Sequence, residues 1–412
     1  MVRQFCLMSD QVFSGIRVLG LTRVYAAPFA AYQLALHGAE VINVEDPVSG
    51  DNVRNMGGAH GKALVDKRMS APFLAHAAGK KSITLNLKSK EGVVIFRRLA
   101  AESDVLIENL RTGGMDALGL GYQDISAINP AIVYCSLTGY GQTGPRAREA
   151  VIDPVIQAGS GLMSITGTPE SGPLKAGCSI SDYTAGMSLT VGIITALYHR
   201  QRTGVGQHVD VSMLETTLSM MSANVSDVMN AGHRPGLIGN RSGNNSQISD
   251  VFPCGDGRSI FIAANMASLR DKLWDALERP HWKTDPLFRD VDALRANVEA
   301  VFEAIATITR TRPVDEWVRI FGAAGVPAMK INTIAEAVDD PQIKAREYFH
   351  TFESVPGLDR PVRVQKAPYR LSKTPARLDT PPPLLGAHNV EVLGRLGYGA
   401  DDLVRLRRDG VI

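Results

Sequence analysis

Cysteine is scarce and dispersed in this chain. Four cysteines occur among 412 residues, at Cys6, Cys135, Cys178 and Cys254, and no two of them form a CxxC pair. A zinc knuckle or a disulfide framework needs closely spaced cysteines, so the sequence argues against both. Unpaired thiols are typical of a reducing compartment, and we therefore expect a cytoplasmic protein.

Blocks of one charge and long apolar runs are also missing. The 44 Lys and Arg residues nearly balance the 42 Asp and Glu residues, and no dense basic run appears. The most apolar stretch, 185–198, is interrupted by Gly, Ser and Thr and is too short to span a bilayer. Residues 1–13 contain no apolar run of signal-peptide length. We expect neither a nucleic acid nor a membrane as partner.

Several catalytic motifs are absent as well. The nine histidines include no HExxH and no paired metal-ligand spacing, so we expect no metal site. The nucleophile elbow GxSxG does not occur, because "GCSIS" has Ser181 where the second glycine is needed. These absences argue against a metallohydrolase and a serine hydrolase.

Apolar strand patterns alternate with helical patterns in the first half of the chain. Strands are predicted at 14–21, 39–45, 82–87, 105–110 and 131–138, and helices at 28–38, 90–104 and 122–129. This alternation is typical of an α/β domain with a mostly parallel sheet that is covered on both faces. The length of 412 residues suggests two or three domains.

The second half of the chain suggests a smaller domain. A long helix follows Asp182, a strand is predicted at 207–213 and one helix at 214–232. The Gly, Asn and Ser-rich stretch 236–247 predicts a mobile loop at a domain boundary. A hairpin turning at 255–257 and helices over 268–325 follow, with Trp274, Trp282 and Trp317 as expected core residues. A return segment and a Pro-rich strap lead to a closing helix.

The stretch "GYGQTG" at 139–144 has the GxGxxG form of a dinucleotide cradle. It follows a late strand rather than the first one, and Pro145-Arg146 opens no clear amphipathic helix. We therefore prefer a tight loop whose backbone approaches some other ligand over nicotinamide binding.

Asp182 stands where a small-residue stretch runs into the long helix. Its spacing favours a plain N-cap, whose carboxylate would satisfy the first amides of the helix. The same place suits a reactive carboxylate, because the helix N-terminus favours negative charge and would keep the acid ionised. Cys178, close by, is more simply interpreted as a small buried residue than as a thiolate nucleophile. Local spacing leaves both alternatives for Asp182 open.

Nearly the whole chain, from Gly15 to Ile412, resembles the family III CoA-transferases, which include formyl-CoA:oxalate and carnitine CoA-transferases and the related 2-methylacyl-CoA racemases. Seven stretches carry the resemblance in sequence order: "GIRVLGLTRVYAAPFAAYQLALHGAEVINVEDP", "GKKSITLNLKSKEG", "DVLIENLRTGGMDALGLGY", "NPAIVYCSLTGYGQTGP", "VIQAGSGLMSITG", "SDYTAGMSLTVGIITALYHRQRTGVGQHVDVSM" and "TPPPLLGAHNVEVL".

The resemblance implies an α/β fold with a Rossmann-like large domain built from both chain ends and an inserted smaller α+β domain. Two such chains would interlock as an obligate homodimer. We expect the large domain at 10–225, a linker with the active-site loop at 226–250, the small domain at 251–330 and a return segment at 331–412, which completes the large domain.

The resemblance also implies a chemistry. Asp182 aligns with the family's catalytic aspartate, so the protein is expected to be a CoA-transferase of the EC 2.8.3 type. CoA would move from an acyl-CoA donor to a free carboxylic acid through an aspartyl anhydride and an aspartyl-CoA thioester. No permanently bound cofactor is expected, since the CoA thioester is itself the substrate.

Further positions are carried over from the family. The expected CoA and substrate contacts are Tyr25, Ala26, Lys88, Asn109, Leu110, Gly139 and Tyr140. The expected active-site loop comprises Gly243, Asn244, Asn245, Ser246 and Gln247. For Lys88 the alternative is a solvated lysine after a strand. For the loop the alternative is a disordered linker.

The chain departs from the family at several places. Asp46, Ala117 and Ala150 replace basic residues that some members use for the CoA phosphates, and Ala77-Ala78 replaces a common Asn-Arg pair. The alternative of a racemase requires a His directly before Asp153, where this chain has Ile152. A non-catalytic CoA-binding protein on the same fold is the remaining alternative.

Overall fold

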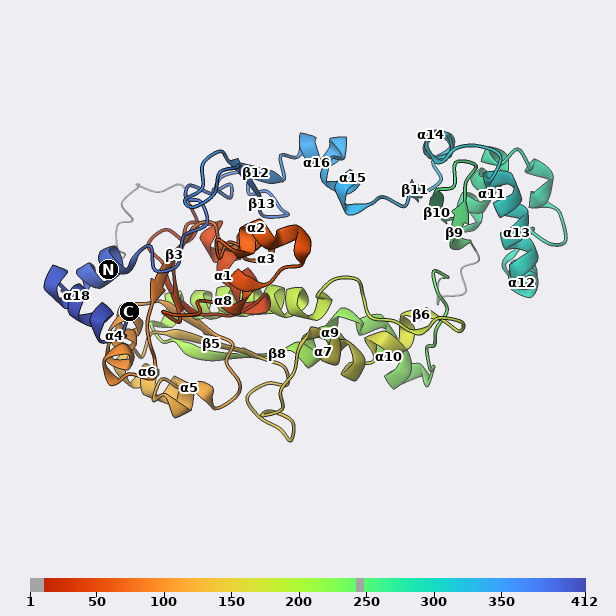
Figure 1. Cartoon of the computed structure of the whole chain (residues 1–412). Coiled ribbons are helices and arrows are strands. Elements are labelled where there is room, and N and C mark those ends of the chain that lie inside the picture. Colours follow the sequence, from red (N-terminus) through yellow and green to blue (C-terminus); the bar gives the residue numbers. More distant parts are fainter. Residues whose placement is uncertain (1–10, 242–247) are drawn as a thin grey trace. The chain divides into compact units, whose positions relative to one another are not determined.

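The computed structural model describes residues 11–241 and 248–412, which form two compact units (Figure 1). Unit 1 contains the chain up to Leu162 together with Ala176–Val225 and Arg346–Ile412. Unit 2 contains Met163–Lys175 and Ser226–Ala345. Segments from both ends of the chain therefore fold into the same unit.

A parallel sheet of six strands forms the centre of unit 1, in the order β3-β2-β1-β4-β5-β8. The strands are β1 (Arg17–Leu21), β2 (Glu40–Glu45), β3 (Lys80–Thr84), β4 (Val105–Glu108), β5 (Val133–Thr138) and β8 (Gln207–Ser212). Every residue of β4 and β5 is buried, as expected for strands covered on both faces. The predicted α/β architecture with a parallel sheet is confirmed.

Helices cover both faces of this sheet. One face packs against α4 (Lys90–Ala101), α6 (Tyr122–Ile128), α17 (Asn389–Arg395) and α18 (Ala400–Arg408), so that the C-terminal helices lie beside α4 (Figure 1). The other face packs against α1 (Ala26–Ala35), α7 (Asp153–Gly159), α8 (Ile180–Thr203) and α9 (Met213–Met220). Two separate apolar cores result, one on each side of the sheet.

The outer side of α1 carries a third core in unit 1. It includes Tyr32, Phe73, Phe352 and Val364. The contributing elements are α2 (Lys62–Val65), α3 (Ala71–Ala77) and the antiparallel pair β12 (Phe349–Phe352) and β13 (Val362–Gln365). Short elements complete the unit: 3-10 helices at Asn52–Asn55 and Ala59–Gly61, and α5 (Gly114–Ala117).

Helix α8 is the longest helix and supports the site. Its buried residues Ala185, Leu189 and Ile193 recur at helical spacing and face the sheet. At Gly186 an added Cβ would lie 2.6 Å from the carbonyl oxygen of Ala26, so the absence of a side chain lets α1 and α8 touch. The helix ends at Gly204, whose φ of 78° suits glycine. Within the described ranges, no helix has both the length and the hydropathy that a membrane span requires.

Unit 2 has its own small sheet and core. Strands β9 (Ser249–Pro253), β10 (Ser259–Ala263) and β11 (Ala328–Lys330) are antiparallel in the order β11-β10-β9, and the predicted hairpin at 255–257 is confirmed. Trp274, Trp282 and Trp317 are at most 7% exposed, which confirms them as core residues. The helices of this core are α11 (Ala267–Ala276), α12 (Val291–Ala296), α13 (Val298–Thr309) and α14 (Val314–Ala324), with a 3-10 turn at Pro280–Lys283.

Smaller elements complete the description. They are a 3-10 turn at Leu162–Ile165, β6 (Gly167–Thr168), β7 (Gly172–Pro173), α10 (Ser222–Ala231), α15 (Ile334–Val338) and α16 (Pro341–Ala345). The prediction of one helix over 214–232 is wrong, because the backbone leaves the helical conformation at Met221 and separates α9 from α10. No glycine or proline marks this break in the sequence.

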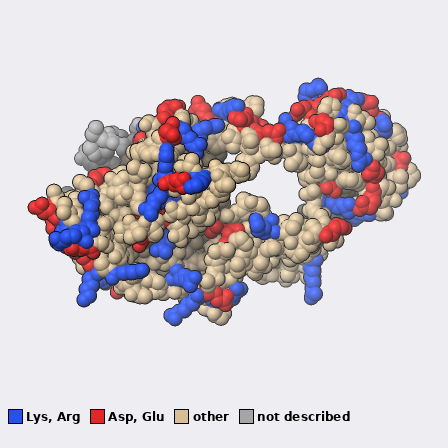
Figure 2. All heavy atoms as spheres, viewed as in Figure 1, with Lys and Arg blue, Asp and Glu red and all other residues tan. Residues whose placement is uncertain are grey.

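Acidic and basic side chains are interspersed on the surface of each unit in the view of Figure 2. Most of the ion pairs involve exposed or half-exposed groups, such as Lys62 with Asp66 and Arg310 with Glu303. Pairs of this kind contribute little to stability. The mixed surface agrees with the near-neutral net charge of +2.

Candidate active site

The candidate site lies at the carboxyl ends of neighbouring strands in unit 1. β1 and β4 pair in the centre of the sheet, and the chain leaves β1 toward β2 on one side and β4 toward β5 on the other. Ligands of open α/β sheets bind outside such a switch point. The loop after β1 meets Asn109, the residue after β4. The amide of Arg23 donates to Asn109 Oδ1 at 2.8 Å, and Asn109 Nδ2 donates to the Arg23 carbonyl oxygen at 2.9 Å.

The first turn of α8 brings Asp182 into this region without using it as a cap. The N-cap is Ser179, which makes no side-chain cap, and Asp182 stands inside the helix. Asp153 Oδ1, from the start of α7, accepts hydrogen bonds from the amides of Ser181 at 2.7 Å and Asp182 at 3.1 Å. The interpretation of Asp182 as a plain N-cap is therefore wrong, because a different carboxylate satisfies these amides.

Asp153 is held in place by buried polar contacts. Gln157 Nε2 donates to Asp153 Oδ2 at 2.6 Å, and Gln157 Oε1 accepts from the amide of Ala176 at 2.8 Å. Asp153 is 5% exposed and Gln157 is fully buried. Sequence reasoning missed the role of Asp153, although Asp followed by Pro154 is a helix-start signal that could have drawn attention to it.

The carboxylate of Asp182 is half-buried and carries an unusual pKa. Burial, and then the charge of Asp153, raise the pKa of Asp182 to about 7. Over residues 11–241 and 248–412, no group donates a hydrogen bond to its side-chain oxygens. The expectation that the helix N-terminus keeps this acid ionised is overturned, because burial favours the protonated form, and Asp153 adds a like charge and already accepts from the helix amides.

Aromatic rings stand beside Asp182. The ring of Tyr25 stacks on that of Tyr183 with centroids 6.3 Å apart, and Phe29 and His76 approach Tyr183 edge-on at 5.4 and 5.6 Å. Burial and the charge of Asp182 raise the pKa of Tyr25. The structure thus brings Tyr25, an expected substrate contact, close to Asp182.

The other expected contact residues occupy different places. Ala26 is buried against α8, and the amide of Leu110 donates to Glu108 Oε2 at 2.8 Å just after β4. Lys88 is exposed beyond β3, where its charge helps to lower the pKa of Asp46. Asn109 and Leu110 therefore lie at the switch point, and Lys88 lies on the surface near Asp46.

The GxGxxG stretch forms a loop after β5. An added Cβ at Gly139 would lie 1.9 Å from Val151 Cγ1, so only glycine fits there. Arg146 lies over the ring of Tyr140 at 4.1 Å and donates to its hydroxyl. No helix follows until α7 begins at Asp153, so the helix that a dinucleotide cradle requires is missing from this loop.

Cysteines and candidate metal ligands complete the survey. Cys178 is exposed directly before α8, so the interpretation as a small buried residue is wrong. In the part of the chain that the structure describes, no cluster of three or more His, Cys, Asp or Glu side chains could hold a metal ion. The expected loop residues Gly243, Asn244, Asn245, Ser246 and Gln247 lie outside the described residues.

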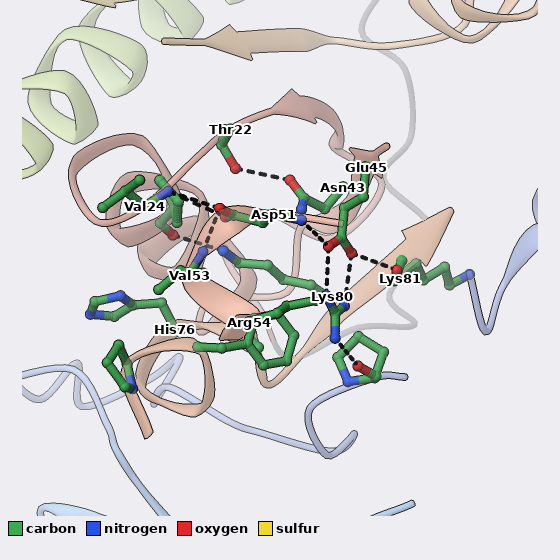
Figure 3. A pocket seen from close by; sticks show the side chains of 16 residues that line it. Thr22, Val24, Asn43, Glu45, Asp51, Val53, Arg54, His76, Lys80 and Lys81 are labelled. Atoms are coloured by element: carbon green, nitrogen blue, oxygen red, sulfur yellow. Dashed lines mark hydrogen bonds and ion pairs between the residues drawn. The ribbon is translucent and has the colours of Figure 1, made fainter. Parts of the chain in front are cut away.

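A buried polar cluster behind the β1 loop was not anticipated (Figure 3). Arg54 Nε and Nη2 donate to the two oxygens of Glu45 at 2.6 and 2.8 Å, and both side chains are 1% exposed. Lys80 Nζ donates to the carbonyl oxygen of Pro28 at 2.7 Å, and burial lowers the pKa of Lys80 to about 7. These groups line a cavity of about 20 Å³, which has room for one water molecule.

His76 lines the same cavity from α3. Its Nδ1 is buried and, within the described residues, has no hydrogen-bond partner. Burial lowers the pKa of His76 to about 3, so the ring is neutral at physiological pH. The cluster therefore reaches from the core of β2 and β3 to the aromatic rings beside Asp182.

Comparisons with known proteins identify the family of the chain. The family model described as CoA-transferase family III matches residues 13–389. The chain is 36% identical over 390 residues to succinate–glutarate CoA-transferase of Agrobacterium fabrum, covering 93% of this chain and 95% of that protein. It is also 36% identical over 353 residues to acetyl-CoA:oxalate CoA-transferase of Acetobacter aceti, covering 85% and 89%.

A solved structure shows the same fold. The crystal structure of a CAIB/BAIF family protein from Brucella suis superimposes with a TM-score of 0.84 at 33% identity, covering 94% of this chain and all of that one. The parallel sheet, the long match to the family model and the named relatives agree. The chain therefore belongs to CoA-transferase family III and is a transferase enzyme.

Proposed function

We propose that this protein transfers CoA between dicarboxylic acids, with Asp182 as the covalent nucleophile. The observation that carries the proposal is the Asp182 carboxylate, which is half-buried beside Tyr25 and Tyr183 and is not used to cap α8. The names of the relatives supply the substrate class. They include succinate, glutarate and oxalate, and a further relative, at 35% identity, is succinyl-CoA–D-citramalate CoA-transferase of Chloroflexus aurantiacus.

The proposed reaction proceeds through two kinds of acyl intermediate. An ionised Asp182 oxygen attacks the thioester carbonyl of the donor, and CoA leaves as its thiolate, which produces an acyl–aspartyl anhydride. The thiolate then attacks the aspartyl carbonyl carbon, the donor acid leaves as a carboxylate, and an aspartyl-CoA thioester remains. The acceptor carboxylate attacks this thioester and expels the thiolate. Attack of the thiolate on the acceptor carbonyl forms the new acyl-CoA and restores the Asp182 carboxylate.

The environment of Asp182 supports this role. A carboxylate that is partly shielded from water is less solvated and therefore more reactive than one on the surface. The neighbouring Tyr25 and Ala26, and Asn109 and Leu110 at the next strand end, are proposed to contact CoA and the acyl group, with Gly139 and Tyr140 from the loop after β5. Lys88 is proposed to meet a CoA phosphate. The thioester bond energy is conserved throughout, so the proposal needs no permanent cofactor.

A racemase on the same fold is disfavoured by two observations. The position of the imidazole is taken by Ile152, which is 67% exposed. The Asp153 carboxylate, which would be its partner, is engaged by the amides of α8 and by Gln157. An isoleucine side chain cannot carry a proton, and the carboxylate of Asp153 is already hydrogen-bonded. This pair therefore cannot remove and deliver a proton at the carbon next to a thioester.

We also propose the interlocked homodimer that the family resemblance implies. In unit 1, the side chains of Met187, Val191, Ile194 and Tyr198 form an exposed apolar stripe along α8, each at least 43% exposed in the single chain. A second copy that covers this stripe would remove it from water.

The domain division proposed is 10–225 and 331–412 for the large domain, 226–250 for the linker and active-site loop, and 251–330 for the small domain. The free thiols of Cys135, Cys178 and Cys254 support a cytoplasmic location.

A donor and acceptor matrix tests the proposed reaction. The purified protein is incubated with succinyl-CoA or acetyl-CoA and with glutarate, oxalate, malate, acetate or butyrate, and new thioesters are separated by chromatography. We expect new acyl-CoA products with dicarboxylic acceptors and little with the monocarboxylic controls. Deuterium incorporation next to the thioester carbonyl in D2O, without a new thioester, would instead support the racemase.

The pKa of Asp182 predicts the pH dependence of the reaction. Only the ionised carboxylate attacks, so kcat/KM of the free enzyme should rise with pH and level off above about 7. Asp153→Asn removes the like charge and should move this acid limb to lower pH, by about one unit or less, since burial is the larger cause. The measurement is kcat/KM from pH 5 to 9 for both proteins.

The control for Asp153→Asn is the plateau value of kcat/KM at high pH. The asparagine amide places a donor against Gln157 Nε2, and this mismatch costs on the order of 1 kcal/mol of stability. This loss of stability can lower the plateau of kcat/KM, but it does not change the pH at which kcat/KM rises. A limb that does not move would contradict the electrostatic effect of Asp153 on Asp182.

A further inference from the structure

Val24, in the loop between β1 and α1, has an unusual backbone conformation. Among the described residues, four non-glycine residues have positive φ, namely Val24, Arg68, Glu278 and Glu347, and only Val24 is β-branched. Its φ of 65° lies in the left-handed region, which branched side chains rarely adopt. Such a conformation persists only where surrounding contacts hold it.

Three side chains bind the loop between β1 and α1. They come from β2, from the residue after β4 and from the turn after β2. Asn43 Oδ1 accepts from Thr22 Oγ1 at 2.9 Å, and Asn109 binds both backbone groups of Arg23. Both oxygens of Asp51 lie 3.2 Å from the amide nitrogen of Val24. Figure 3 shows the contacts of Asn43 and Asp51. We call Asn43, Asn109 and Asp51 the clamp residues.

Asp51 is itself fixed by the buried cluster. It is 6% exposed, its amide donates to Glu45 Oε2 at 3.0 Å, and its Oδ1 also accepts from the amide of Val53 at 3.0 Å. Glu45 is in turn paired with Arg54. The conformation of Val24 is therefore connected to the most buried ion pair of unit 1 rather than to solvent.

The residue after Val24 is Tyr25, which is the N-cap of α1. No side chain caps this helix end, so the preceding loop sets where the helix starts. The ring of Tyr25 stacks on Tyr183, the residue next to Asp182. A change of the Val24 backbone would therefore move Tyr25 with respect to the first turn of α8.

We propose that the clamp residues are positioning residues for acyl transfer: they hold Val24 in its left-handed conformation and so place Tyr25 beside Asp182. This inference rests on the proposed function of Asp182. A glycine at position 24 would adopt the left-handed conformation without steric cost, so the backbone conformation alone does not require a valine there. The use of valine together with three clamps indicates that one fixed position of the loop is required.

Two pairs of variants test the proposal. Val24→Gly keeps the left-handed conformation accessible but lets the loop move, and Glu347→Gly is its matched control, since Glu347 is an exposed residue of unit 1 with φ of 48°. Asp51→Ala removes the clamp, whereas Asp51→Asn keeps an oxygen that accepts from the amides of Val24 and Val53. The assay uses succinyl-CoA with glutarate, and hydrogen–deuterium exchange of residues 21–30 is measured on the free enzyme.

We expect kcat to fall about 10- to 100-fold for Val24→Gly and Asp51→Ala, with KM changed by less than about threefold. Exchange at 21–30 should be faster in Asp51→Ala and restored in Asp51→Asn, which should also recover most of kcat. Glu347→Gly should behave as the wild type in both measurements.

Two results would overturn the proposal. One is a kcat for Val24→Gly equal to that of Glu347→Gly. The other is unchanged exchange at 21–30 in Asp51→Ala. If Asp51→Ala does not fold, the Val24→Gly comparison still decides. Exchange is measured without substrate, so it reports on the clamp even if Asp182 proves dispensable, and the two proposals can fail separately.

Discussion

Replacing Asp182 with alanine or asparagine should lower kcat/KM for CoA transfer by about 10⁴-fold or more. The reason is that every step of the proposed reaction forms or breaks a bond to this carboxylate. Direct attack of a free acid on the donor thioester has no comparable path. The assay is the donor and acceptor matrix, with the wild type and both variants at equal concentration.

A covalent intermediate provides the direct evidence. Wild-type protein quenched during turnover with succinyl-CoA should contain a peptide that carries CoA on Asp182, detected by mass spectrometry. Neither variant should contain it. Turnover by the alanine variant, or a modified peptide at another residue, would contradict the assignment of the nucleophile.

The Asp182→Asn variant should at the same time be more stable than the wild type at alkaline pH. Burial and Asp153 raise the pKa of Asp182 to about 7, so the folded state holds its proton more tightly than the unfolded chain does. That stabilisation is complete below the usual aspartate pKa of 3.8 and is lost as the pH rises through about 7.

At pH 8 the asparagine variant should therefore gain up to about 4 kcal/mol, and at pH 3 it should equal the wild type. Urea unfolding at both pH values measures this difference. Light scattering supplies the control for assembly, and we expect wild type and variant alike to show twice the mass of one chain.

Arg54→Met should be the most destabilising single substitution considered for unit 1. Arg54 is fully buried, makes two short contacts with Glu45 and lies over the ring of Phe73 at 3.8 Å. Its removal leaves the buried Glu45 carboxylate without its ion-pair partner. Such a loss costs about 3–5 kcal/mol. Urea unfolding at pH 7 measures the effect.

The matched control is the double variant Glu45→Gln with Arg54→Met. The glutamine amide oxygen still accepts from Ser82 Oγ or the amide of Asp51, and the charges of both members of the Glu45–Arg54 pair are removed together. We expect this pair to recover at least half of the lost stability. A single variant within about 1 kcal/mol of the wild type would show that Glu45 finds another partner or takes up a proton at little cost.

Local pattern was a good guide to the sheet and a poor guide to hydrogen bonding. The strands β4 and β5 were predictable because parallel strands covered on both faces appear as continuous apolar runs. The break at Met221 was not predictable, since no glycine or proline marks it. Cys178 was expected to be buried and is exposed, because the exposure of one small residue depends on what packs over it.

The candidate site shows the same limit. Family resemblance pointed to Asp182 and Tyr25, and the structure places the two near each other. It named Asp153 only in connection with the racemase alternative, and it did not point to the contact of Asp153 with α8 or to Asp51 and His76, whose partners lie on other elements of the chain. Asn109 was expected to contact CoA, and the structure adds that it binds the backbone of Arg23 from the neighbouring strand.

The order of apolar and polar residues was sufficient to predict the α/β class and the parallel sheet, and the seven quoted stretches carried the resemblance to the family III CoA-transferases. Only the tertiary structure decided that the carboxylate of Asp153, and not that of Asp182, accepts from the first amides of α8. The physical reason is that caps, pKa shifts and backbone strain arise between groups that are distant in the chain. Asp153 and Asp182 stand on different helices, and their effect on one another exists only once α7 and α8 are packed together.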